Sequence, residues 1–221
     1  MANFQGHITT SGVLGIGVGA AGVYYLHYDW GVAGLAAGLT TIGGMLPDLD
    51  SDSGIPVREL FGLAGVIVPL MLTPRLQHQN LTPEQLLVIM ALAYLFVRYG
   101  LSELFRKISV HRGMFHSVPA MLIAGLAVFL MHHDAARAYA PGEMRERLYL
   151  AGGTMLGFLS HLVLDELFAV NLMGVVPHLN QFAGSAVKLW SKSWLATLTT
   201  YTILGLLAYM AWVSIGSPKW S

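Results

Sequence analysis

The chain has 221 residues, of which 55% are hydrophobic and only 11% are charged. Because a soluble domain carries about 25% charged residues, this composition excludes an ordinary soluble globule and indicates a membrane protein. The formal net charge is zero and no basic run occurs, which argues against nucleic-acid binding. Cysteine is absent, so disulfides and thiolate zinc sites are excluded, and any metal must be bound by His, Asp or Glu.

Seven apolar stretches predict an all-α, polytopic bundle of about five to seven membrane helices, forming a single domain over residues 1–221. They cover residues 8–26, 31–46, 60–73, 84–100, 117–133, 147–164 and 194–215. Several are shorter than the roughly 20 residues that cross a bilayer, and 60–73 is expected to be re-entrant or half-buried. No Lys or Arg precedes the first stretch, so it is interpreted as a retained span and not as a secretory signal.

Glycine recurs in the first two stretches, in GVLGIGVGAAG at residues 12–22 and in GVAGLAAGLTTIGG at residues 31–44. Small side chains let helix backbones approach closely inside lipid. These two helices are therefore predicted to pack on each other.

The stretch MLPDLDSDSG, residues 45–54, places Asp48, Asp50 and Asp52 at alternate positions directly after an apolar run. An EF-hand loop has carboxylates at this spacing and a glycine at its sixth position. Here the glycine is displaced to Gly54, so a calcium loop is disfavoured. A solvated turn explains Asp52 well, but it explains less well why Asp48 lies at the edge of the bilayer.

His161 and Asp165, in HLVLD, are four residues apart in an apolar run and so share one face of a helix. An ionisable pair inside a membrane is costly and indicates a function or a partner. Two interpretations stay open. The pair forms a buried His–Asp hydrogen bond, or it supplies two metal ligands from one helix face, as the histidines of HExxH helices do.

The segment SVHRGMFHSVPA contains His111 and His116, which are five residues apart and are not neighbours on a straight helix. Ser117 is predicted to cap a helix that has Pro119 in its first turn, which places His111 in a turn and His116 just before the helix. The two imidazoles can then converge on one point, although single histidines are more often packed or surface residues. Arg112 cannot bind a metal, but its planar fork suits an anionic group such as phosphate.

The order of the seven predicted spans decides which polar residues share a side of the membrane. The side of the N-terminus collects His7, Asp48, Asp50, Asp52, His111, His116, His161, Asp165 and His178, and the opposite side holds His27, His78, His132 and His133. Lys and Arg divide seven to five in favour of the first side, and by the positive-inside tendency this small excess favours a cytoplasmic first side. The order of the spans therefore predicts one polar site at one membrane face.

Four motifs occur in order: Gly-His at 6–7, LPDLDSDSG at 46–54, HRGMFHS at 111–117 and GFLSHLVLDEL at 157–167. This set resembles the bacterial family of LexA-regulated, membrane-bound, metal-dependent hydrolases, and the resemblance spans about residues 6–190. The chain departs from the family pattern at Phe115, where Thr is usual. That family is distantly similar to the all-helical group of zinc-dependent phospholipases C and single-strand nucleases. The resemblance implies phosphoester hydrolysis at the bacterial inner membrane.

The resemblance also implies the roles of individual residues. The expected metal ligands are His7, Asp48, His111, His116, His161 and Asp165, with Asp50 as a further ligand, a bridging carboxylate or the general base, and Arg112 as a contact to phosphate. So many ligands exceed what one tetrahedral zinc needs, which implies two or more divalent ions. Zinc is preferred, with manganese or iron as alternatives. Water activated by the metal is expected to attack a phosphoester of a lipid or another amphiphile.

A protein of another class remains an alternative: a non-hydrolytic metal-binding membrane protein, or a transporter that uses His161 and Asp165 along an ion pathway. The segment AVKLWSKSW, residues 186–194, adds an expected membrane contact. Lys188 and Lys192 lie beside two tryptophans, which suits an interfacial helix that contacts anionic headgroups, or an ordinary interface anchor. His178 stays open as a ligand or a substrate contact. The expected partners are the bilayer and its amphiphilic substrate, and the sequence does not decide the oligomeric state.

Overall fold

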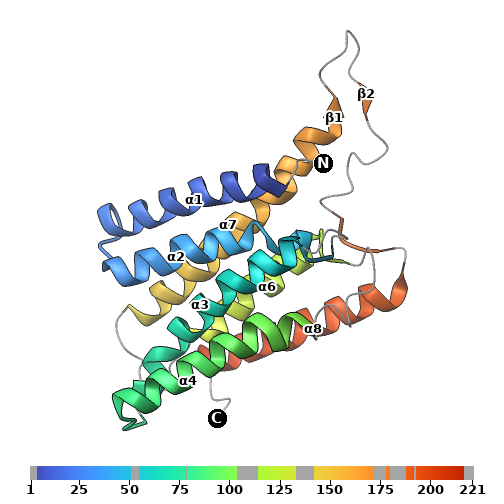
Figure 1. Ribbon diagram of the computed structural model, residues 1–221. Helices are drawn as coiled ribbons and strands as arrows, with labels where there is room; N and C mark the ends of the chain where they lie inside the picture. Colours follow the sequence, from blue (N-terminus) through green and yellow to red (C-terminus); the bar gives the residue numbers. More distant parts are fainter. Residues whose placement is uncertain are drawn as a thin grey trace.

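The computed structural model describes residues 4–50, 55–77, 79–103, 114–132, 142–171, 178–179, 188–191 and 193–216. The chain folds as an all-α bundle, as predicted (Figure 1). Its elements are α1 (Phe4–Tyr24), α2 (Trp30–Gly43), the 3-10 turn η1 (Leu46–Asp50), α3 (Ile55–Gln77), α4 (Pro83–Leu95), the π-helical turn η2 (Phe96–Leu101), α6 (Val118–Met131), α7 (Glu143–Ala169), β1 (Val170–Asn171), β2 (His178–Leu179) and α8 (Trp194–Ser214). The two strands are only two residues long each and pair antiparallel beyond the end of α7.

Each of the seven apolar stretches corresponds to one helix, and η2 continues α4 without a break. Both α3 and α7 are longer than their predicted stretches, and α3 is a single helix of 23 residues where 60–73 was predicted. Pro56 lies in its first turn, where the missing backbone N–H of proline is tolerated, so the helix begins earlier than the apolar pattern does. The prediction that 60–73 is re-entrant depended on the short length of that stretch, and the helix that contains it is longer.

Within the described residues, three helices are long and apolar enough to cross a membrane: Pro83–Leu101, Glu143–Phe168 and Trp194–Ser214. The helices α2 and α6 are apolar but shorter. The outer faces of Pro83–Leu101 and Trp194–Ser214 expose large apolar side chains, including Leu87, Leu92 and Leu206. Exposed apolar surface on this scale is typical of a lipid-facing surface and not of a soluble monomer.

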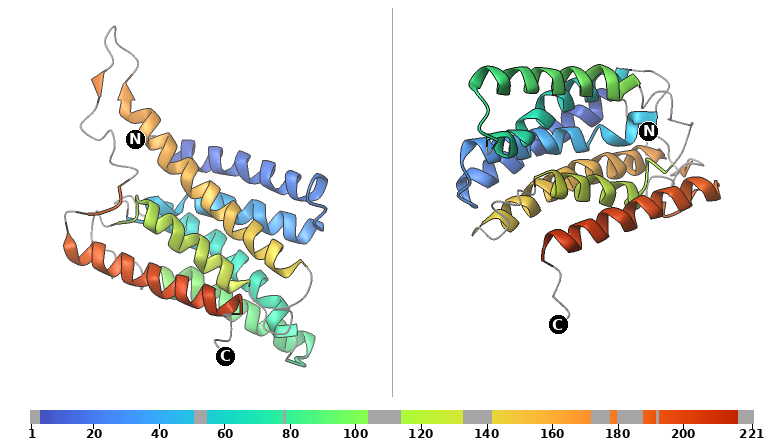
Figure 2. Two further views of the ribbon diagram at one scale, coloured as in Figure 1. Left: turned by 180° about the vertical axis from the view of Figure 1, so that it is seen from behind. Right: turned by 90° about the horizontal axis from the view of Figure 1, so that it is seen from below.

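The helices form two neighbouring groups: in the right-hand view of Figure 2, α1 to α4 lie on one side of the bundle, and α6, α7 and α8 lie on the other. In the first group, α1 packs on α2, as their glycine-rich sequences predicted, and α3 packs on α2, α4 and η2. In the second group, α6 lies between α7 and α8, and α7 packs on α2 and so joins the two groups. The start of α1 and the end of α7 therefore lie at the same end of the bundle (Figure 1).

The contact between α2 and α7 depends on glycines at the crossing. A Cβ atom at Gly43 would collide with the backbone carbonyl of Thr154, and one at Gly157 would collide with the backbone carbonyl of Thr40. Backbone atoms cannot yield as a flexible side chain can, so only glycine allows this spacing. The close approach brings the loop after α2 against the part of α7 that carries His161.

A buried arginine joins three helices at the end of the bundle opposite to His161. Arg147 of α7 donates from Nε to the carbonyl of Phe129 on α6 at 3.1 Å and from Nη2 to Oγ of Ser214 on α8 at 2.6 Å. Its guanidinium lies 3.7 Å from the centroid of the Phe129 ring, and Nη1 is 3.6 Å from Oε2 of Glu143. These contacts fix α8 against α6 and α7 far from the polar residues described next.

Candidate metal centre

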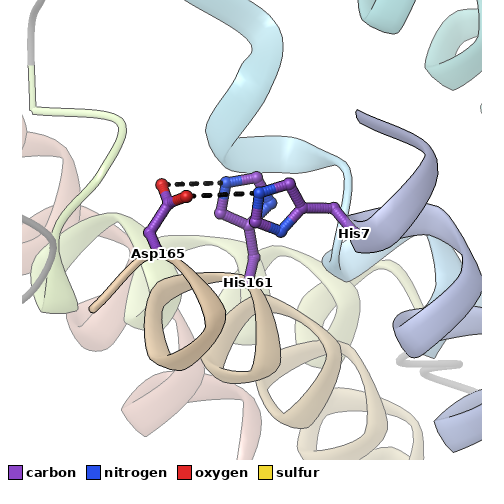
Figure 3. Close-up of side chains that lie close together, drawn as sticks. All are labelled: His7, His161 and Asp165. Carbon is purple, nitrogen blue, oxygen red and sulfur yellow. Dashed lines mark ion pairs between the residues drawn. The ribbon is translucent and has the colours of Figure 1, made fainter. Parts of the chain in front are cut away.

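Five of the predicted ligands converge at one end of the bundle. His7 comes from the first turns of α1, Asp48 from η1, His116 from the residue before the cap of α6, and His161 and Asp165 from α7. Figure 3 shows the stacked imidazoles of His7 and His161 facing the carboxylate of Asp165. We call these five residues the His–Asp cluster. Segments separated by more than a hundred residues thus meet there, as the order of the spans predicted.

The orientation of His161 is fixed by a backbone carbonyl. Its Nδ1 lies 2.8 Å from the carbonyl oxygen of Gly44, the residue that ends α2. A carbonyl can only accept a hydrogen bond, so Nδ1 carries the proton, and in the neutral ring Nε2 presents a lone pair to the cluster. This is the arrangement by which proteins orient a metal-binding histidine.

Four distances in the cluster are slightly longer than the separation of two ligands on one zinc ion. Nε2 of His161 lies 3.6 Å from Oδ1 of Asp48 and 3.7 Å from Oδ2 of Asp165. Nε2 of His116 lies 3.9 Å and 3.7 Å from the same two atoms. Two ligand atoms that are each bonded to a tetrahedral zinc at 2.0–2.1 Å are roughly 3.3 Å apart. The separations therefore leave room for an ion and are too long for direct hydrogen bonds.

That geometry bears on the two interpretations of His161 and Asp165. The i,i+4 spacing does place both on one face of α7, and both are buried. Nε2 of His161 lies 3.7 Å from Oδ2 of Asp165, which exceeds hydrogen-bond distance, so the direct hydrogen bond is not formed. Asp165 lies nearer to His7, with 3.3 Å between Oδ1 and Nε2.

The ligand atoms form two overlapping groups. One group consists of His7, His161 and Asp165, and the other consists of Asp48, His116 and His161. Within each group, one ligand atom per residue lies within 4.8 Å of the others. The imidazole of His7 stacks on that of His161 at 3.6 Å between centroids, and His116 meets His161 edge-on at 5.4 Å. His161 is thus shared between the two groups.

Burial differs across the cluster. The side chains of His7, His161 and Asp165 are at most 4% exposed, whereas those of His116 and Asp48 are 15% and 20% exposed. The cluster therefore has a closed side against α1 and α7 and an open side at η1 and the start of α6. Catalytic metal sites keep an open position of this kind, whereas structural sites are closed.

The start of α6 holds His116 in place. Ser117 caps α6 as predicted: its hydroxyl accepts from the backbone N–H of Ala120 at 3.2 Å and donates to the carbonyl of Met114. Pro119 lies in the first turn, also as predicted. Lys188 forms an isolated parallel bridge with Ser117, so the segment before α8 lies alongside this loop.

The interfacial helix expected over residues 186–194 is not found among its described residues. Residues 188–191 form the bridge and a bend, and α8 begins only at Trp194 with Ser193 as its cap. Side-chain hydroxyls take the backbone donors that a helix would use: Thr197 Oγ1 accepts from Ser191 N, and Ser191 Oγ accepts from Ser193 N. The helical interpretation of this segment was therefore wrong.

Two predicted site residues, His111 and Arg112, fall outside the described residues, as does Asp52, which was assigned to a solvated turn. Asp50 is the last residue of η1, and its side chain is not described either. The backbone of His178 pairs with Asn171 in the short hairpin beyond α7. Their predicted roles stay predictions.

Sequence reasoning missed Gly44. Its contribution is a backbone carbonyl, which any residue type has, so no side-chain pattern could reveal it. The available signal was the Gly43-Gly44 pair, one residue before the LPDLD motif, which indicates a close backbone approach.

The fold and the cluster together define a helical membrane protein with a buried His–Asp cluster at one end of its bundle. Comparison with family models identifies the family: the model described as YdjM inner membrane protein matches residues 1–219. The chain therefore belongs to the YdjM inner membrane protein family. No curated protein and no solved structure matches the chain.

Proposed function

We propose that this protein is a multi-pass inner-membrane hydrolase that uses divalent metal ions to cleave a phosphoester of a lipid or similar amphiphile. The observation that carries the proposal is the convergence of three imidazoles and two carboxylates, with His161 oriented by the carbonyl of Gly44. An ionisable cluster in a membrane protein is costly unless it binds something or reacts.

The residues of the cluster fit a metal. Among the described residues, the buried Nε2 of His161 and Nδ1 of His7 have no hydrogen-bond partner. Such nitrogens are rare in folded proteins and call for an explanation, and a bound ion supplies one for Nε2 of His161. The mixture of imidazole and carboxylate suits zinc, manganese or iron. Five donors exceed the four of one tetrahedral zinc, which favours two or more ions, with zinc preferred.

The two sides of the cluster have different tasks in this proposal. When bound, divalent ions lower the pKa of water and stabilise the charge that develops on phosphoryl oxygens. His7, His161 and Asp165 hold the ions on the closed side and exclude bulk water there. Asp48 and His116 border the open side, where the phosphoester enters. The predicted roles of Asp50 as general base and Arg112 as phosphate contact complete this proposal.

The position of the cluster supports an amphiphilic substrate. It lies toward the C-terminal end of α7, a helix that is long enough to cross a bilayer, and so near the level of the lipid headgroups. Trp190 and Trp194 lie at the start of α8, at the same end of the bundle as the cluster, and both are exposed. Tryptophan is enriched at membrane interfaces, so this end of the bundle is assigned to one membrane surface.

A transporter is the competing proposal, and the sequence of α7 argues against it. Between Arg147 and His161 this helix has no Asp, Glu, Lys, Arg or His. An ion or proton pathway across the membrane normally uses such residues along its length. Arg147 itself is committed to contacts with α6 and α8.

The experiment is a hydrolysis screen of phospholipids and model phosphodiesters with protein purified in detergent, with and without a chelator. We expect turnover that stops with chelator, returns with zinc or manganese, and falls at least a hundredfold in Asp165→Asn. Glu59→Gln, an exposed carboxylate at the start of α3, is the matched control and should retain activity. Metal-dependent ion uptake into proteoliposomes without turnover of any ester would support the transporter instead.

A further inference from the structure

An apolar cavity of about 390 Å³ lies between α3 and α6, and α2, α7 and α8 complete its wall. Its volume falls within the roughly 300–1,000 Å³ of small-molecule sites. In the described part of the chain, α3 and α6 do not pack closely on each other, because α3 packs on α2 and α4 and α6 packs on α7 and α8. The cavity therefore fills a space between two helix groups.

The chemistry of the lining excludes a polar occupant. Every lining side chain is apolar except those of Thr154 and Thr200. Both hydroxyls are already used: Thr154 donates to the carbonyl of Leu150 at 2.9 Å, and Thr200 donates to the carbonyl of Ala196 at 2.8 Å. Water needs two to four polar partners to be held in a cavity, and the side chains of this wall offer only the lone pairs of two hydroxyls whose hydrogens are already bonded. Hydrocarbon is the occupant that matches it.

The cavity begins beside the His–Asp cluster. Leu46 lies two residues before Asp48, and Phe115 directly precedes His116; both line the cavity. Along α6 the lining runs from Ala120 to Met131, a depth of roughly 16 Å at 1.5 Å per residue. The cavity thus extends from the open side of the cluster along the bundle toward its opposite end.

We infer that this cavity binds one hydrocarbon chain of an amphiphile whose polar group lies at the His–Asp cluster. At roughly 30 Å³ per heavy atom, the volume of a water molecule in the liquid, the cavity takes about a dozen carbon atoms of one chain. A second chain of the same lipid would stay in the bilayer. The identity of the polar group rests on the proposed function, but the chain site can be tested without hydrolysis.

The test uses alkylphosphonates, whose carbon–phosphorus bond resists hydrolysis, and native mass spectrometry of the purified protein. The wild type should bind dodecylphosphonate at least tenfold more tightly than butylphosphonate. Ala124→Phe fills the cavity and should reduce this ratio to below twofold. Ala208→Phe makes the same change on the exposed face of α8 and should leave the ratio unchanged. Equal ratios in both variants would overturn the chain site.

A second variant guards against a folding defect in Ala124→Phe. Met131 lines the deep end of the cavity, so Met131→Ala should lengthen it and shift the tightest binding to a longer alkyl chain. A misfolded protein cannot produce this gain, and an unchanged chain-length optimum contradicts the inference. Chain-dependent binding in a protein that hydrolyses no phosphoester would reject the proposed function and leave the chain site standing.

Discussion

At the scale of single residues, the three aspartates of MLPDLDSDSG are not equivalent. Asp48 lies within 3.6 Å of His161 Nε2, whereas the sequence assigns Asp52 to a solvated turn. We therefore predict that Asp48→Ala removes most of the bound metal, while Asp52→Ala leaves it nearly unchanged. Metal analysis of the two purified variants checks this, and an equal loss in both would contradict the assignment.

The carbonyl of Gly44 gives a second prediction at this scale. A Cβ atom at Gly44 would collide with the side chain of Ser11, although the backbone conformation of Gly44 is one that alanine adopts. Gly44→Ala should displace the carbonyl that orients His161 and weaken metal binding about tenfold, the usual effect of losing such a partner. Gly17→Ala, where a Cβ meets nothing within 4 Å, is the matched control.

The same site offers a rescue experiment. Because the collision is with the Ser11 side chain, adding Ser11→Gly to Gly44→Ala should restore much of the metal affinity, as measured by competition with a chromogenic chelator. If the double variant binds no better than the single one, the weaker binding has another cause and the role of the carbonyl is wrong.

At the scale of elements, Arg147 links α6, α7 and α8. Arg147→Ala removes its hydrogen bonds and leaves Glu143 buried without its ion pair, so we predict a loss of about 3 kcal/mol in the free energy of unfolding. Arg145→Ala, on the exposed face of the same helix, should change it by less than about 0.5 kcal/mol. Thermal unfolding in detergent compares them, and similar midpoints would contradict this role.

The elements also show what the sequence could reveal. Apolar stretches predicted the seven α-helices that the structure describes, because lipid-facing and buried residues are both apolar and leave a strong pattern. The cap at Ser117 was predictable, since capping is local chemistry. The segment around Lys188 was not, because its conformation depends on pairing with Ser117, more than seventy residues away. The extra length of α3 was missed because its ends are less apolar than its centre.

At the scale of the whole molecule, the order of the spans predicted which polar residues share a side of the membrane, and the family resemblance implied which of them are ligands. Alternation across the membrane placed His7, Asp48, His116, His161 and Asp165 on one side, and the structure brings all five together. On the other side, His132 lies 3.4 Å from Glu146. Alternation does not fix distances, however. The spacing of the cluster depends on the close crossing of α2 and α7, which only the folded structure shows.

The central claim is that the His–Asp cluster binds metal, and the most direct test is the metal content of the purified protein. Inductively coupled plasma mass spectrometry should find at least one divalent transition metal ion per chain, with zinc preferred. His161→Ala should lose most of it, because His161 belongs to both ligand groups. A wild-type protein without such metal after growth in zinc-supplemented medium, or equal content in His161→Ala, would contradict the account.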